Sequence, residues 1–206
     1  MTADTRTSNR GRKIKAVLAG GVVLGVGAAV TLAAWTDQEW AEGIFGAGDF
    51  NIEGSTDGAT WTDHASEGGA AELGFDLDAA SNLSPGDTVA APFILRTDAA
   101  TTYAATVSLD SVTAEGPNAA NLTYGIVQVD SAASCTEDAT GTEIVPSGTA
   151  LSAAPTAATF DLAEAPSGTA GAPTTLCFVV SAGNDLVEGG AATAHWGFVA
   201  ESVEAA

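Results

Sequence analysis

The chain has 206 residues, with 26 acidic and 6 basic side chains and a formal net charge of −20 at pH 7. Five of the six basic residues lie before residue 16, and Arg96 is the only one after it. A surface this acidic repels phosphate backbones and anionic lipid headgroups, which argues against nucleic-acid binding and against electrostatic attachment to a membrane.

The N-terminal segment has the three-part layout of a secretory signal peptide. A basic head at residues 10–15 precedes an uncharged run of small and aliphatic residues at 16–34. The head favours the cytoplasmic side, and the run enters the bilayer as a short helix. With 19 residues, the run could alternatively remain as an anchor that just spans a core of ~30 Å. Its four glycines, and the lack of a basic residue after it until Arg96, favour cleavage over anchoring.

Short segments of alternating apolar residues follow, and this pattern is typical of β-strands. We expect strands at 45–52, 73–77, 88–96, 103–109, 122–129, 159–162, 176–181 and 193–203, with a further short one at 60–62. Residues 84–87 predict a tight turn, because Pro85 presets φ and Gly86 accepts a positive φ. Outside the expected strands, residues 131–158 and 164–174 are predicted to be loops. The prediction is an all-β, antiparallel, jelly-roll-like β-sandwich preceded by an N-terminal signal helix.

The chain contains two cysteines, Cys135 and Cys177, both after the signal segment. An even number of cysteines in an exported chain predicts one disulfide, with two free thiols as the alternative. The bond would close a loop of 42 residues, for which the chain-entropy model gives a stabilisation of roughly 4 kcal/mol.

Residue patterns that carry catalysis are absent from the sequence. There is no H-E-x-x-H motif, and His64 and His195 are 131 residues apart, whereas a catalytic zinc needs about three protein ligands. We interpret His64 as an exposed loop residue and His195 as a strand-surface residue. No G-x-S-x-G nucleophile motif occurs. We therefore expect no catalytic, cofactor-binding or metal-binding residues, and a protein that is not an enzyme.

Residues 33–37 are AAWTD, and residues 43–52 are GIFGAGDFNI. This junction resembles that of exported proteins cut by the SipW-type signal peptidase, the TasA- and camelysin-like family. The family pattern ends in Phe-x-x-Gly-x-hydrophobic-x-hydrophobic, and Phe45, Gly48, Phe50 and Ile52 occupy those four positions. Residues 82–87 also resemble the family's Leu-x-Pro-Gly-Asp turn, and 192–200 its closing strand. The likeness is good over residues 10–110 and thin over 111–190.

The resemblance implies that a SipW-type signal peptidase cuts between Ala33 and Ala34. Residues 1–33 are then the signal peptide, 34–44 an N-terminal arm and 45–206 a β-sandwich domain. The mature chain would carry one basic side chain against 25 acidic ones, a net charge of −24. The resemblance also implies a secreted or cell-surface bacterial protein, which would be attached to the membrane only through an uncleaved signal segment.

The resemblance also implies a structural role, namely self-assembly into extracellular biofilm-matrix fibres by strand addition. An arm that docks on its own domain would instead form an ordinary edge strand. The alternatives are a monomeric surface binding module and a metallopeptidase of the camelysin kind. The expected assembly strand contains Trp35, Trp40, Phe45, Phe50 and Ile52.

Overall fold

The computed structural model describes residues 10–11, 13–18, 49–75, 82–166 and 168–203. The chain divides into two compact units, residues 1–45 and 46–206. In the first unit the described residues are helical. Within the described ranges, no helix is both long enough and apolar enough to cross a bilayer. The expected cleavage site at Ala33 and Ala34, and the arm residues Trp35, Trp40 and Phe45, lie outside these ranges.

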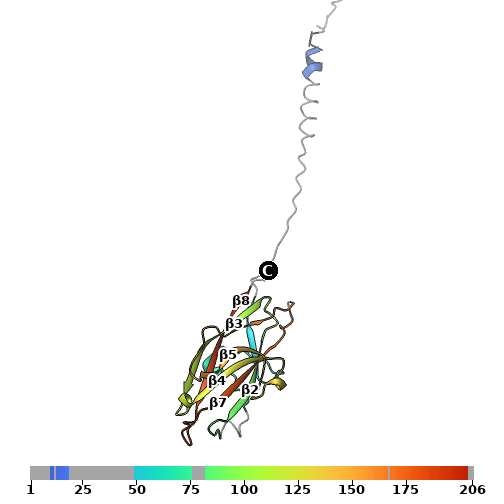
Figure 1. Ribbon diagram of the computed structural model, residues 1–206. Coiled ribbons are helices and arrows are strands. Elements are labelled where there is room, and N and C mark those ends of the chain that lie inside the picture. The colour runs from blue at the N-terminus through green and yellow to red at the C-terminus, as the bar shows by residue number, and fades with distance from the viewer. Residues whose placement is uncertain (1–9, 12, 19–48, 76–81, 167, 204–206) are drawn as a thin grey trace, which may run out of the picture. The chain divides into compact units, whose positions relative to one another are not determined.

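The second unit is a sandwich of two antiparallel sheets, which confirms the predicted all-β fold (Figure 1). The five-stranded sheet has the order β1-β2-β7-β4-β5, and the three-stranded sheet has the order β6-β3-β8. The strands are β1 (Ile52–Ser55), β2 (Thr88–Thr97), β3 (Ala104–Glu115), β4 (Leu122–Val129), β5 (Thr142–Ala150), β6 (Thr159–Leu162), β7 (Thr174–Ala182) and β8 (Thr193–Val203). Three short 3-10 helices, η1 (Glu67–Gly69), η2 (Ala119–Asn121) and η3 (Ala132–Ser134), lie in the connections.

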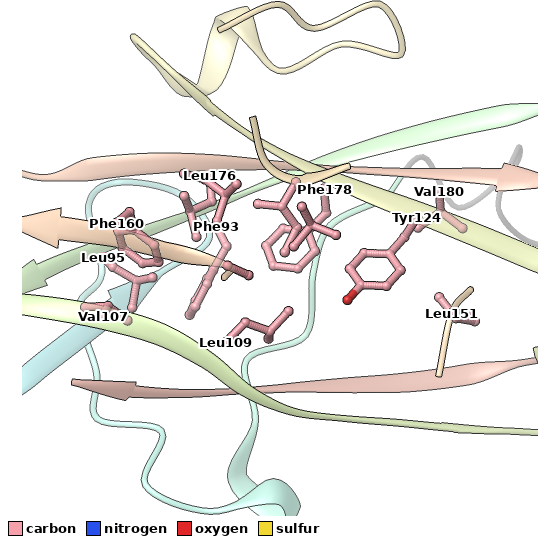
Figure 2. Packing of buried hydrophobic residues seen from close by; sticks show 14 of the residues in the cluster. Phe93, Leu95, Val107, Leu109, Tyr124, Leu151, Phe160, Leu176, Phe178 and Val180 are labelled. Atoms are coloured by element: carbon pink, nitrogen blue, oxygen red, sulfur yellow. The ribbon is translucent and has the colours of Figure 1, made fainter. Parts of the chain in front are cut away.

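Alternate side chains of both sheets meet in one hydrophobic core, as period-two strands require. Figure 2 shows Phe93, Tyr124 and Phe178 among the buried side chains of this cluster. The Phe178 ring makes T-shaped contacts with Trp196 at 5.0 Å and with Phe198 at 6.3 Å, so β7 packs directly against β8. Each fully buried large apolar side chain contributes about 1.5–3 kcal/mol to folding.

Four segments differ from the sequence prediction. Of the expected strand at 73–77, residues 73–75 are described and are not a strand, because the Phe75 N–H donates to the Leu73 carbonyl at 2.9 Å and turns the chain. Of the expected strand at 45–52, residues 49–52 are described, and Ile52 is the only one of them in β1, while Asp49 forms an isolated bridge with Thr101. The expected loop at 131–158 contains β5, and the expected short strand at 60–62 is reduced to one bridge between Thr62 and Gly54.

The predicted turn at residues 84–87 is confirmed. The Asp87 N–H donates to the Ser84 carbonyl at 3.0 Å, and Gly86 has a φ of +88°, which L side chains rarely adopt. The Asp87 carboxylate also accepts a hydrogen bond of 2.7 Å from the Ser84 N–H. This turn leads directly into β2.

The predicted disulfide between Cys135 and Cys177 is confirmed, with 5.1 Å between the two Cα atoms. Cys177 lies in the middle of β7, between the core residues Leu176 and Phe178, so its side chain points to the outer face of the five-stranded sheet. Cys135 directly follows η3. The bond therefore fastens the connection after β4 to the outer face, and it indicates folding in a non-reducing environment.

Candidate functional site

Three of the four edge strands carry features that obstruct pairing with another chain. β1 has only four residues, and Gly54 exchanges main-chain hydrogen bonds of 2.9 and 3.1 Å with Thr62 on its outer side. β5 contains Pro146, and its register with β4 shifts twice. β6 has only four residues. Short length, proline and bulges are devices by which natural proteins protect sheet edges.

β8 lacks these devices. It has eleven residues, contains no proline or lysine, and pairs only with β3 among the described strands. The one register shift in that pair makes Asp110 of β3 the extra residue, so β8 itself is uninterrupted. On its outer face Val199 and Val203 are 46% and 44% exposed. The free side of β8 is therefore the longest unprotected sheet edge in the described domain.

A groove of about 1510 Å³ runs beside β8. Consecutive residues 192–198 line it, from both faces of the strand, so the groove follows the edge of β8 rather than one face. Part of its apolar lining comes from β2 and β7 of the opposite sheet, through Val89, Phe93, Phe178 and Val180. We call this space the β8 groove. An open backbone edge above an apolar floor is the geometry that accepts an extended peptide.

The rim of the β8 groove is acidic. Its charged residues are Glu53, Asp63, Glu67, Glu72 and Glu188, and no lysine or arginine lines it. Glu53 is neutralised by Arg96 at 2.6 Å, and the Arg96 guanidinium lies 3.8 Å above the Trp61 ring. The remaining carboxylates disfavour anionic ligands and favour neutral or cationic ones.

Residues 63–75 form the side of the β8 groove that faces β8, and we call them the strap. Glu67, in η1, connects the strap to the three-stranded sheet. Its Oε1 accepts a hydrogen bond of 2.8 Å from Thr113 Oγ1 and lies 3.3 Å from His195 Nδ1. Thr113 and His195 are cross-strand partners in β3 and β8. The strap thus reaches across β8 to the outer face of the sheet.

Both histidines line the β8 groove, although they are 131 residues apart in sequence. His64 is half-buried rather than exposed as expected, because its ring lies 6.3 Å from that of Phe93 and its Nδ1 lies 3.1 Å from the Gly69 carbonyl. His195 lies in a strand with its side chain 40% exposed, as expected. The described residues contain no group of three or more His, Cys, Asp or Glu side chains that could hold a metal ion.

Trp196 marks the junction between the β8 groove and the core. Its Nε1 is buried and has no hydrogen-bond partner among the described residues, while the adjacent Tyr124 hydroxyl donates to the Ala153 carbonyl at 2.6 Å. Burial raises the pKa of Tyr124 to about 12, and the neighbouring indole N–H of Trp196 opposes this rise.

The described part of the expected assembly strand docks on its own domain. Ile52 is the first residue of β1 and pairs with Thr97 of β2. Phe50 is 38% exposed and belongs to no strand. A segment that pairs with another copy would therefore precede residue 49. The sequence offered no signal for the β8 groove, because the strap and β8 are separated by more than 115 residues.

No family model and no curated protein matches this chain.

Proposed function

We propose that the protein is an exported bacterial structural protein whose copies join by strand addition, as its resemblance to the TasA-like family implies. The acceptor is the free edge of β8, and the donor is the arm at 34–44 of another copy. The unprotected eleven-residue edge of β8 beside an apolar groove is the observation that supports this proposal most strongly. Main-chain hydrogen bonds along such an edge supply affinity, and side chains in the groove supply specificity.

The arm suits this acceptor in length and composition. It has eleven residues, the same number as β8, so two extended segments of about 36 Å would lie side by side. Because Trp35 and Trp40 are five residues apart, an extended arm offers one of them to the apolar floor and the other to the opposite face. Aromatic anchors of this kind contribute most of the affinity in many interfaces.

Cleavage between Ala33 and Ala34 would free the arm. We expect the exported protein to begin at Ala34, which N-terminal sequencing or intact-mass measurement would check. An exported chain that retains the apolar run would contradict this part of the proposal and would favour a permanent anchor.

The assembly proposal is tested by deleting residues 34–44 from the exported protein. We expect the exported chain to form fibres in negative-stain micrographs, and the deletion variant to remain a folded monomer by size-exclusion chromatography and circular dichroism. Isothermal titration calorimetry should show that a synthetic 34–44 peptide binds the deletion variant, whereas a scrambled peptide of the same composition does not. Fibres that form equally well without the arm would remove it from the mechanism.

The size and apolar lining of the β8 groove also favour a second function, that of a monomeric surface module that binds a ligand. In that case the exported chain would stay monomeric in every solution condition, and the acidic rim would select neutral or cationic ligands. We propose a non-enzymatic role in both cases. Casein hydrolysis that a chelator abolishes would instead support a peptidase of the camelysin kind.

A further inference from the structure

We infer that the strap, residues 63–75, is an autoinhibitory clasp that competes with an incoming strand for the edge of β8, and that Glu67 fastens it. The inference rests on the proposed strand addition, since it concerns how access to the same edge is controlled. Its evidence is the pattern of contacts along the strap.

The two ends of the strap are anchored to the body of the domain. At its start, residues 62 and 54 exchange two main-chain hydrogen bonds, and the His64 ring lies against Phe93. At its end, Leu73 and Phe75 pack against the hydrophobic core. These anchors fix where the strap begins and ends, and they leave its central turn, η1, to be held by other contacts.

Among the described residues, the centre of the strap is joined to β3 and β8 by the side chain of Glu67, while His64 contacts the Gly69 carbonyl within the strap. Glu67 Oε1 accepts the hydrogen bond from Thr113 and lies 3.3 Å from His195 Nδ1, and the Glu67 side chain is 61% exposed. In the described part of the chain, no main-chain hydrogen bond joins residues 63–75 to β8. The strap therefore crosses the edge of β8 without using the hydrogen-bonding groups that an added strand would use.

This arrangement makes the strap easy to displace. One hydrogen bond from Thr113 and one exposed contact with the His195 ring hold its centre to β3 and β8, and such contacts are weak because water competes for both partners. An added strand forms a ladder of main-chain hydrogen bonds along the same edge. Loss of the Glu67 contacts should raise the fraction of molecules in which the strap has left the edge of β8 roughly fivefold. The apparent rate of strand addition should rise by the same factor.

The test compares three variants of the exported protein. Glu67→Ala removes the fastening side chain from the strap, and Thr113→Val removes its partner from β3. Glu164→Ala is the matched control, because it removes the same charge from an exposed position outside the β8 groove, where the carboxylate has no hydrogen bond or ion pair with a described residue. Amide hydrogen exchange of residues 63–70 and 193–203 measures opening, and light scattering measures the assembly rate.

We expect Glu67→Ala and Thr113→Val to accelerate exchange of the strap and assembly roughly fivefold, and Glu164→Ala to change neither. Unchanged exchange in the first two variants would overturn the inference, as would faster exchange without faster assembly. Equal acceleration by Glu164→Ala would assign the effect to charge rather than to fastening, which would also overturn it. If no variant assembles, strand addition fails, and the exchange of residues 63–70 alone decides whether Glu67 fastens the strap.

Discussion

The main-chain N–H of Asn51 donates to Thr101 Oγ1 at 2.7 Å, and the Thr101 hydroxyl is shared between the Asn51 carbonyl at 2.9 Å and Asp98 Oδ1 at 2.8 Å. Thr101 is fully buried, and the Asp98 N–H also donates to the Asn51 carbonyl at 3.1 Å. This network fixes the point at which the chain enters the sandwich. It explains why Ile52 pairs with β2 of its own domain. Any segment that adds to another copy would therefore precede residue 49.

Asp98 should make this network sensitive to acid. Burial opposes the ionised form, but hydrogen bonds from Thr101, Asn51 and Ala100 outweigh it and lower the pKa of Asp98 below its usual value. A depressed pKa in the folded state stabilises the fold above the unfolded pKa of about 3.9. That stability is lost as the pH falls through the lower folded value. Asp98→Asn should therefore unfold at lower urea concentration than the unmodified protein at pH 7, with a smaller difference at pH 3.

Asp63→Asn is the control for this measurement, because Asp63 is an exposed carboxylate with no hydrogen bond or ion pair to any described residue. Its urea midpoint should follow that of the unmodified protein at both pH values. A difference between Asp98→Asn and the unmodified protein that stays constant from pH 7 to pH 3 would show that Asp98 acts through packing rather than through its charge.

The sequence predicted those elements whose side chains alternate over a long segment. β8 has the predicted bounds, since residues 193–203 alternate without interruption. β5 was not predicted, because its two buried residues, Ile144 and Val145, are adjacent and Pro146 follows them. Residues 73–77 alternate as a strand does, yet Leu73 and Phe75 reach the core from a turn. An alternating sequence predicts which side chains are buried. It does not show whether another strand lies beside the segment to pair with its backbone.

The candidate site was less predictable than the fold. The histidines appeared unrelated because only the tertiary structure brings the strap to β8. Which edge is open also depends on strand order, and no local pattern encodes strand order. The pairing of Cys135 with Cys177 could be predicted, because two cysteines allow only one intramolecular bond.

The disulfide should contribute strongly to stability. Cys135→Ser should lower the free energy of unfolding by about 2–5 kcal/mol, because the unfolded chain loses its 42-residue cross-link. The double variant with Cys177→Ser should resemble the single variant, as should the reduced protein. Guanidinium unfolding measures the loss, and two titratable thiols in the non-reduced exported protein would contradict the pairing.

Gly54 should be intolerant of a side chain. A Cβ atom there would lie 2.7 Å from Phe93 Cζ and 2.9 Å from Cε2, so Gly54→Ala forces the ring that forms the floor of the β8 groove to move. We expect a loss of about 1–3 kcal/mol in the free energy of unfolding. Gly74→Ala is the control, because a Cβ atom at Gly74 meets no atom of the described residues within 4 Å. Equal losses in the two variants would show that Phe93 does not require the glycine.

Assembly should depend on pH and salt through the charge of the copies. At the net charge of −24 expected for copies cleaved after Ala33, packing brings carboxylates within a Debye length of about 8 Å at 0.15 M salt. Crowded carboxylates bind protons more tightly, so the assembled state holds more protons and falling pH favours it, within roughly pH 4–6. Salt should help by screening, and divalent cations should help more. Light scattering that rises faster at pH 8 in low salt than at pH 5 would mean that repulsion does not control assembly.

The central claim, that β8 is the edge to which another copy adds a strand, is tested most directly by amide hydrogen exchange in the assembled and monomeric exported protein. We expect the peptide covering residues 193–203 to be strongly protected in the assembly, since new main-chain hydrogen bonds form along it. The peptide covering residues 142–150 should exchange equally in both states, because Pro146 and the register shifts obstruct the β5 edge. Unchanged exchange in β8, or new protection confined to β5, would contradict the claim.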